Sequence, residues 1–563
     1  MNAPESLPTR RRKASVRRLR CIGIWGVAAA AVVTAVVLHL AGRTELAVVA
    51  AVAAGLATAF QGGIAALRAL LSAGDGVVGV ARSVIEEAVG TWLPVLLVII
   101  VVVGLPVLPL LLDPSERLEY RLQFFLTWAL TAAGFLLALV TIFLGCFSVC
   151  GDIDSQRIHM VLVKPLGRWQ YLLGKWLGIV LLDGLLVALV GGGVFTVAAT
   201  VRQMPAADAA DRLAVDEEVF TARSVARPEH PRGTDFKADV DAAIEQLLKD
   251  DPQGFTADPS GARKRILAQR VLEWHNVSPD TVAGYVFTGL ERARQAAPVV
   301  QLRLKPFADN VAIDRAPVRF ALWINDRPFP FKDGRHEEFT LISGTFHTIE
   351  IPTTGIDADG RLRLAIANRN LVPPGQTRPA TISFSPGKGL EILYRSGSFR
   401  GNFLRCLAVM WAKLALLAAA ALAAASWLGF PIAVLAALMV YVAAVARGFL
   451  ADAIDIYTGT DRVDAGFIDM VRLRASVLFE RLDRLEFWDA TKTLTSFAAE
   501  GFLALVPSFG AHDGVTEVAT GRLLTAAQAL SSVAELGLAY PLVLLACGWV
   551  LLCKRDLVNV SGF

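Results

Sequence analysis

The chain has 563 residues, of which 54% are hydrophobic and 19% charged, with a net charge of +4 at neutral pH. An average soluble domain is about 45–50% apolar and about 25% charged, and here the apolar residues concentrate in blocks near both ends, on either side of a charge-rich middle. This distribution excludes a fully soluble enzyme and an all-membrane protein. The small net charge, without a basic stripe, predicts no nucleic-acid partner.

Eight apolar blocks are long enough to cross a bilayer as helices. A bilayer core of about 30 Å requires roughly 20 helical residues, and the backbone polar groups of each segment must be paired within it. In chain order the blocks are Cys21–Leu40, Glu45–Phe60, Trp92–Leu112, Leu122–Cys150, Trp176–Val201, Leu404–Phe430, Pro431–Leu450 and Leu536–Cys553.

The distribution of basic residues predicts which ends are cytoplasmic. The arm at residues 1–20 carries seven basic residues against one acid, and the connection at 151–175 and the C-terminal tail are also basic. With eight spans, all three lie on the cytoplasmic side, as the positive-inside rule requires. Residues 21–60 then form an uncleaved membrane hairpin, which is favoured over a signal peptide, and residues 61–91 form an amphipathic cytoplasmic segment.

Residues 202–403 connect an outward span to an inward one, so we expect them outside the cytoplasm. Within residues 202–297, apolar residues at spacings of three and four predict helices, at 236–248, 263–274 and 282–295. These segments define an external helical region.

Residues 298–403 change to an alternating pattern. Short runs of alternating polarity are separated by turn signals, which predicts strands at 299–304, 318–324, 338–342, 346–351, 362–367, 381–384 and 390–394. Such a series is typical of a β-sandwich of the jelly-roll or immunoglobulin type, a fold that assigns no function by itself. The predicted fold class is therefore a polytopic α-helical membrane protein of about eight spans, with a large inserted extracytoplasmic α+β domain ending in a β-sandwich.

Candidate metal and catalytic residues are sparse. His336, Glu337, Glu338 and His347 fall on one predicted hairpin, where an ordinary solvated edge is favoured over a metal site. The sequence has no catalytic signature, and Gly174-Lys175 is followed by Trp176 instead of the hydroxyl residue of a phosphate-binding loop. All six cysteines lie in or beside apolar blocks, which favours packing roles over disulfides or zinc. We expect no catalytic residue, metal or cofactor.

The connection at residues 151–175 has an unusual pattern. It begins with two acids and a serine, suited to a helix N-terminus, continues as a short apolar run, and is broken at Lys164-Pro165 before the next span. This pattern predicts a short helix lying along the membrane surface with an apolar edge exposed to a partner. The alternative is a plain interfacial loop anchored by Trp169 and Tyr171.

This stretch resembles the ABC-2 type permeases, the membrane subunits of ABC transporters, and is similar to the nitrous-oxide-reductase maturation and gliding-motility permeases. In that family an acidic start leads through an apolar run to Lys-Pro, a nearby Arg and a closing Gly-Lys. The matching residues are Asp152, Asp154, Leu162, Val163, Lys164, Pro165, Arg168, Gly174 and Lys175. Two positions depart from the family pattern, because its usual Glu is Asp here and its Gly-Thr step is replaced by Gln156-Arg157-Ile158.

The resemblance implies a plan for the chain. Residues 92–201 would be the first permease half, 404–450 two further membrane helices, and 536–563 the last span with its cytoplasmic tail, whose Lys554-Arg555-Asp556-Leu557 is similar to the family's ending. The external domain would be an insertion. Residues 451–535 are expected outside, with an amphipathic or re-entrant helix at 497–507.

The resemblance also implies a mechanism. The segment 151–175 would be a coupling helix seated on a separate ABC ATPase subunit, and a second permease subunit, identical or different, would pair with this one. The chain itself would not be an enzyme. Lys164, Arg168 and Lys175 would contact the ATPase or anionic membrane lipid. The substrate or envelope partner of the external domain is left open.

Two charges are expected near the middle of the membrane. Asp183 and Lys413 each lie about 12–14 Å from the ends of their spans, counting 1.5 Å per residue. Because ionisable residues at this depth usually find partners, we expect them to pair within one subunit or across the dimer. The alternative places Lys413 outward and Asp183 beside a water-filled vestibule. The rival function is a membrane-anchored extracytoplasmic binding or scaffold protein that needs no ATPase.

Overall fold

The computed structural model of the chain describes residues 44–72, 76–90, 113–156, 167–229, 237–250, 273–309, 317–372, 377–385, 389–458 and 506–555, except 114 and 333–334, together with isolated positions between these ranges. The chain divides into two units. The helical unit comprises Met1–Phe220 and Phe399–Phe563, and the β-rich unit comprises Thr221–Ser398. The β-rich unit is thus inserted into the sequence of the helical unit.

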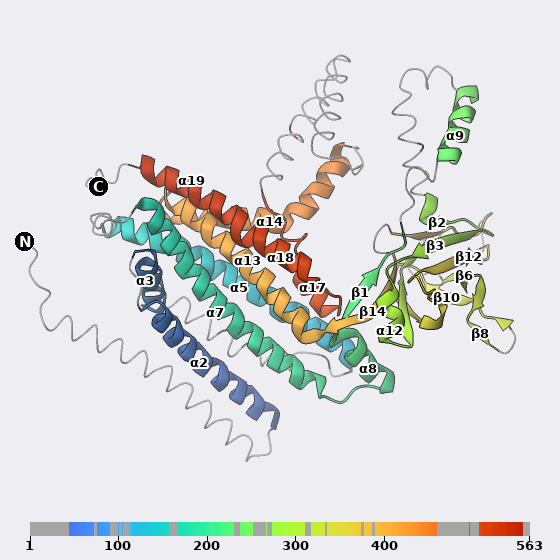
Figure 1. The fold of residues 1–563 in the computed structure, drawn as a ribbon, viewed down its shortest axis with the longest axis horizontal. Helices are drawn as coiled ribbons and strands as arrows, with labels where there is room; N and C mark the ends of the chain where they lie inside the picture. Colours follow the sequence, from blue (N-terminus) through green and yellow to red (C-terminus); the bar gives the residue numbers. More distant parts are fainter. Residues whose placement is uncertain are drawn as a thin grey trace, which may run out of the picture. The chain divides into compact units, whose positions relative to one another are not determined.

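Long apolar helices build the helical unit (Figure 1). Within the described ranges, six helical stretches are long and apolar enough to cross a membrane. They lie in α2 (Thr44–Leu70), α5 (Leu118–Asp154), α7 (Arg168–Arg202), α13 (Phe399–Ala425), α14 (Phe430–Thr458) and the continuous run of α18 (Ala526–Ala534), the π-helical turn η4 (Glu535–Ala539) and α19 (Tyr540–Lys554). The predicted combination of a membrane-type helical part with a β-rich part is confirmed at this level.

The predicted spans differ from these helices in extent. Residues 21–40 lie outside the described residues, as do nearly all of 92–112. Helix α5 has 37 residues and α7 has 35, which is about 55 Å and about 52 Å of helix, well beyond a bilayer core of about 30 Å. Both helices therefore extend past any apolar layer that they cross.

Helix α13 is the common packing partner in the helical unit. It packs against α5, α7, α14 and α19, and Figure 1 shows these helices running together. Its second half is rich in alanine and almost fully buried, and small residues allow helix backbones to approach closely. Cys146 and Cys150 of α5 direct their thiols to the carbonyls of Ala421 and Ala425. Both cysteines are free, in agreement with a packing role.

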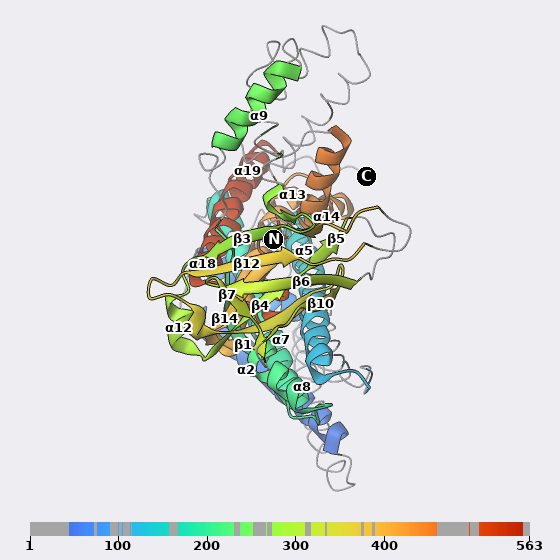
Figure 2. The same cartoon turned by 90° about the vertical axis from the view of Figure 1, so that its right-hand side faces the viewer.

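The β-rich unit contains two antiparallel sheets around one core (Figure 2). One sheet has the order β1-β14-β4-β11, and the other has the order β10-β6-β12-β3 with β7 paired to β6. These strands are β1 (Thr221–Ala226), β3 (Val282–Phe287), β4 (Val299–Leu304), β6 (Pro317–Ile324), β7 (Arg327–Phe329), β10 (Phe339–Ile342), β11 (His347–Pro352), β12 (Leu362–Asn368) and β14 (Leu390–Ser398). Both sheets contribute to one cluster that includes Leu302, Phe320, Leu364 and Ile392.

Smaller elements complete this unit. A three-stranded sheet has the order β2-β13-β5, and a separate hairpin pairs β8 with β9. Their bounds, with those of the unit's helices, are β2 (Asn276–Val277), β5 (Pro306–Ala308), β8 (Phe331–Lys332), β9 (Arg335–His336), β13 (Ile382–Phe384), α9 (Lys237–Asp250), α12 (Glu291–Ala296) and the 3-10 turn η3 (Thr353–Gly355).

All seven predicted strands are present, whereas one predicted helix is wrong. The helix predicted at 236–248 is α9, and 263–274 lies mostly outside the described residues. Residues 282–295 instead form strand β3 and then the short helix α12. The reason is that Tyr285 and Phe287 alternate into the core while the strand pairs with β12. Strand pairing buries these aromatic side chains more completely than an exposed helix would.

A distant carboxylate holds the start of α5. Asp211, in helix α8 (Ala209–Ala214), accepts hydrogen bonds from the backbone N–H groups of Leu118 (2.9 Å), Glu119 (3.0 Å) and Ala207 (2.9 Å). The first four N–H groups of a helix have no intrahelical acceptor. Asp211 thus caps α5 from 92 residues away in sequence, for which the sequence gives no local signal.

We expect Asp211→Asn to remove an acid-sensitive part of the stability. Burial raises the pKa of Asp211, but the three backbone N–H groups and the Arg117 charge outweigh burial and lower it from 3.8. A carboxyl with a lowered folded pKa stabilises the fold above its ordinary pKa and loses that contribution as the pH falls through the folded value. The wild type should therefore melt above the variant at pH 7, and the difference should shrink as the pH falls below 3.8. Thermal unfolding from pH 7 to pH 3 measures this, and a constant difference would contradict it.

Candidate functional site at the connection of α5 and α7

The predicted coupling segment joins the facing ends of α5 and α7. Five of its nine predicted residues are described, namely Asp152, Asp154, Arg168, Gly174 and Lys175. The other four lie outside the described residues, namely Leu162, Val163, Lys164 and Pro165. One expectation for this segment is wrong, because the two acids do not begin a helix. They lie in the last turn of α5, and Ser155 is its C-terminal cap.

A buried ionic cluster connects the two helix ends. The ammonium of Lys175 lies 2.7 Å from Oδ2 of Asp152 and 3.5 Å from Oε2 of Glu87, and it donates a 2.9 Å hydrogen bond to the carbonyl of Ser148. The hydroxyl of Tyr171 donates to the same Asp152 oxygen at 2.8 Å. We call these five residues the Lys175 cluster. It explains why an acid is tolerated at the negative end of the α5 dipole.

The burial of Lys175 corrects the expectation that its charge meets an ATPase or a lipid headgroup. Its side chain is only 2% exposed, and its partners come from this chain. A buried ammonium requires such partners, because an unpaired charge in an apolar interior is very costly. Asp154, by contrast, is exposed at the end of α5. The acid and the lysine of the family-like pattern therefore contact each other across the connection.

The close approach of a neighbouring helix explains why the residue before Lys175 is a glycine. Helix α3 (Val77–Gly90) packs across α7, and a Cβ at Gly174 would lie 2.7 Å from Cβ of Val80. Gly178, one turn further, would place a Cβ 2.7 Å from the carbonyl oxygen of Ala81. Two small residues four apart are the usual means of close helix contact in membranes. The Glu87 member of the cluster then follows from the docking of α3.

Arg168 is engaged by the last membrane helix. Its Nη1 donates to the carbonyls of Leu552 (2.9 Å) and Cys553 (3.1 Å), at the C-terminal end of α19. Those carbonyls have no intrahelical donor, and a cation there also complements the helix dipole. Arg168 is partly exposed, so this contact occupies one side of the guanidinium. The start of α7 and the end of the chain's last helix are thus held together.

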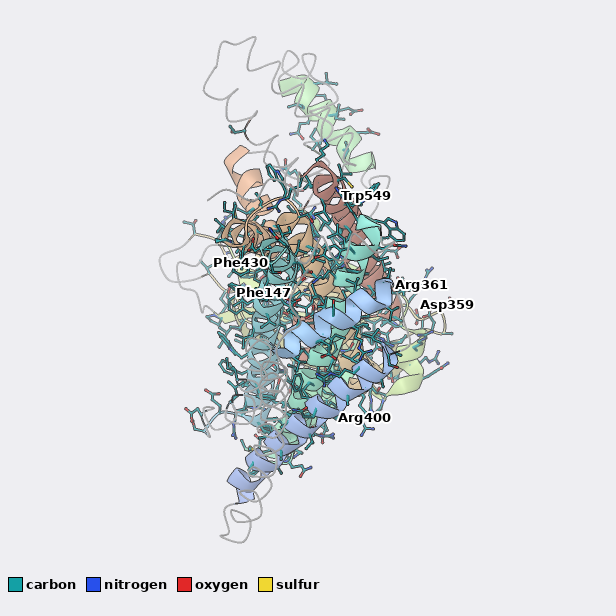
Figure 3. The ribbon with its side chains drawn as sticks, turned by 90° about the vertical axis from the view of Figure 1, so that its left-hand side faces the viewer. Phe147, Asp359, Arg361, Arg400, Phe430 and Trp549 are labelled. Carbon is teal, nitrogen blue, oxygen red and sulfur yellow. The ribbon has the colours of Figure 1, made fainter. Side chains whose placement is uncertain are left out.

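An aromatic contact lies about two turns from the same end of α5. Phe147 packs edge-on against Phe430 of α14, with ring centroids 6.3 Å apart, and Figure 3 shows the two side chains close together. Phe147 is 43% exposed. Helix α14 is therefore attached near the connection as well. Around the described ends of the connection, α5 and α7 pack against each other, α3 contacts both of them, α14 contacts α5, and α19 contacts α7.

The cluster members Glu87 and Tyr171 were not predicted. Glu87 lies within the segment 61–91, for which the sequence predicts only an amphipathic cytoplasmic segment, and Tyr171 is predicted only as an anchor of an interfacial loop. The sequence offers one signal for this cluster, because Lys175 directly precedes an apolar span and acids lie earlier in the same connection. That pattern indicates a buried partner, but it does not identify which acid supplies it.

Asp183 and Lys413 do not pair within the chain. Asp183 is fully buried and lies 3.0 Å from the hydroxyl of Thr141 in α5. Lys413 donates to the carbonyl of Phe509 at 3.0 Å and lies over its ring. The prediction of a pair within one subunit is therefore wrong, because Asp183 contacts α5 whereas Lys413 contacts the turn at Phe509. Pairing across a dimer stays a prediction.

The predicted hairpin carboxylate and histidine have separate partners. Glu338 pairs with Arg319 at 3.1 Å, and Nε2 of His347 contacts the hydroxyl of Thr345 at 2.8 Å. Over the described ranges, no three His, Cys, Asp or Glu residues lie close enough to hold a metal ion.

Comparisons with protein-family models, curated proteins and solved structures found no match to this chain.

Proposed function

We propose that the chain is the permease subunit of an ABC-2 type ABC transporter in an inner or plasma membrane. A separate ATPase would dock on residues 151–175 from the cytoplasm, and a second permease subunit would complete the membrane unit. Both termini would be cytoplasmic, and residues 202–403 would lie outside. ATP hydrolysis would drive export or mechanical work on an envelope partner through the external unit.

The observation that carries this proposal is the Lys175 cluster. A segment that transmits force must be fixed at both ends, and the cluster ties the end of α5, the start of α7 and helix α3 by buried charge-assisted contacts. Such contacts are shorter and stronger than neutral hydrogen bonds. A displacement of residues 157–166 would therefore move three helices together instead of deforming a loose loop.

The arrangement of helix ends gives further support. Arg168 joins the start of α7 to the end of α19, where the basic Lys554 follows. The other end of α5, its N-terminus at Leu118, is held by Asp211. Arg168 and Lys554 therefore lie at one end of the helical unit, as expected if the connection and the C-terminal tail both face the cytoplasm.

Leu162→Glu and Val163→Glu test the proposal. A charge on the apolar edge should abolish copurification of an ATPase that carries a phosphate-binding loop, because burying an unpaired carboxylate is costly. The matched control is Leu371→Glu, a change at a position that is 68% exposed in the β-rich unit. The measurement is the amount of ATPase recovered with the tagged chain from its native membrane.

The alternative function predicts a different result. A membrane-anchored binding or scaffold protein would purify without any ATPase, and both edge variants would match the wild type in every partner recovered. That outcome would contradict the permease proposal.

A further inference from the structure

A cavity of about 300 Å³ lies in the helical unit, away from the α5–α7 connection. Its wall is formed by α5, α13, α14 and the segment 509–516, which includes the start of α17 (Gly514–Ala519). Most of the side chains around it are apolar, among them Leu130, Val409, Met410 and Leu414. A volume of this size is within the range of sites for small organic ligands.

One cation faces this apolar space. The ammonium of Lys413 makes a hydrogen bond to the carbonyl of Phe509 (3.0 Å) and stands 5.3 Å from the centre of its ring. Among the described residues Lys413 forms no ion pair, and Asp513 is the acid whose charge acts on it. An ammonium has three donors, so two remain for a ligand. A lysine held in an apolar wall gains most from an anion.

The acid nearest in the wall is otherwise engaged. Oδ1 of Asp513 accepts from the backbone N–H groups of Val515 (3.0 Å) and Thr516 (3.3 Å), so it caps the start of α17. This carboxylate attracts Lys413 at longer range and would repel an anionic ligand. Removing the charge of Asp513 should therefore strengthen anion binding. The test thus includes a variant expected to bind the anion more tightly, beside variants expected to bind it less tightly.

The rim of the cavity is apolar and exposed. Phe135 of α5 is 48% exposed, and Val445 of α14 is 55% exposed. Tyr441 packs against Phe135 (ring centroids 6.3 Å apart) and against Phe509 (6.2 Å). In a helical unit of membrane type, exposed apolar side chains at a rim face acyl chains, so the cavity is open to a molecule that diffuses within the bilayer.

We infer that this cavity binds an anionic amphiphile from the surrounding bilayer, with its acidic head on Lys413 and its chain along the apolar wall. The inference requires the helical unit to lie in a membrane and does not require an ATPase. It can fail while the permease proposal stands, and the reverse also holds.

The test is native mass spectrometry of the full-length protein released from nanodiscs. The discs contain phosphatidylcholine alone, phosphatidylcholine with phosphatidylglycerol, or phosphatidylcholine with oleate. We expect the wild type to retain one phosphatidylglycerol or one oleate in preference to phosphatidylcholine. Retention of the first identifies a phosphate-headed lipid and of the second a fatty acid, and either supports the inference. Equal retention of phosphatidylcholine would overturn it.

Substitutions at Lys413 and Asp513 test binding of the acidic head group separately from binding of the acyl chain. Lys413→Met should weaken retention about tenfold, the scale of one charge-assisted hydrogen bond, whereas Lys413→Arg should preserve it. Asp513→Asn keeps a capping side chain and should increase retention.

Filling the cavity tests the chain-binding wall. A Cβ at Gly134 meets only Met410 Cε, at 3.9 Å, so the side chain of Gly134→Leu enters the cavity and should abolish retention with Lys413 intact. Its control is Gly192→Leu on α7, where a Cβ meets no atom within 4 Å. Wild-type retention by Lys413→Met and Gly134→Leu, both folded, would overturn the inference.

Discussion

Lys175→Met is expected to lower the free energy of unfolding by about 3–5 kcal/mol, the typical cost of removing one partner from a buried ion pair. The variant leaves the carboxylates of Asp152 and Glu87 without the ammonium that lies 2.7 Å and 3.5 Å away. The measurement is thermal unfolding of the purified protein, read by the temperature at which it aggregates or loses helical signal. Lys554→Met, which removes an exposed cation near the same end, should change the melting temperature little.

The double variant Lys175→Met, Asp152→Asn makes this prediction specific. If the two side chains act as a pair, the double variant should be less destabilised than the sum of the two single variants. Glu87 and the hydroxyl of Tyr171 remain, so full recovery is not expected. Strict additivity, or a Lys175→Met protein that melts with the wild type, would contradict a stabilising role for the Lys175 cluster.

Gly178→Val is expected to separate α3 from α7 and to cost about 1–3 kcal/mol, the usual range for overpacking. A Cβ there would lie 2.7 Å from the carbonyl oxygen of Ala81 and 2.9 Å from Cβ of Val84, and the backbone atom cannot rotate away. The valine change at Gly192, which faces open space, is the matched control.

The displacement of α3 can be read by thiol labelling. Val84 is fully buried in the α3–α7 contact, so a cysteine placed there, in a background without Cys21, Cys547 and Cys553, should resist a maleimide reagent. Adding Gly178→Val should make this cysteine reactive. Equal protection in both backgrounds would show that α3 stays docked, and the close packing of Gly178 would then not hold the helix.

These two predictions bear on how the connection would act as a coupling element. The Lys175 cluster and the Gly174–Gly178 face attach α3 to α7 by two different means, one electrostatic and one steric. If the proposed function holds, loss of either contact should leave ATPase binding intact while reducing the work transmitted to α5 and α7. The Leu162→Glu and Val163→Glu variants would instead lose ATPase binding while leaving the contact of α3 with α7 intact.

The sequence by itself determined the elements whose signal is local. Runs of about 20 apolar residues predict membrane-type helices because backbone groups in lipid must be paired within the segment, and alternation predicts strands such as β4 and β12 because successive side chains face opposite sides of a sheet. The helix predicted at 282–295 is wrong because Tyr285 and Phe287, two residues apart, share the buried face of a strand, and this strand pairs with the distant β12.

Only the tertiary structure decided which charges meet. Asp183 and Lys413 are recognisable from the sequence as intramembrane charges, whereas Asp152 and Lys175 are predicted only as members of the coupling segment. Their partners, however, lie on other elements: Glu87 on α3 for Lys175, Thr141 on α5 for Asp183, and Phe509 in the turn before α17 for Lys413. The physical reason is that the penalty for an unpaired charge depends on local composition, whereas the partner that relieves it depends on how helices far apart in the chain pack and rotate against one another.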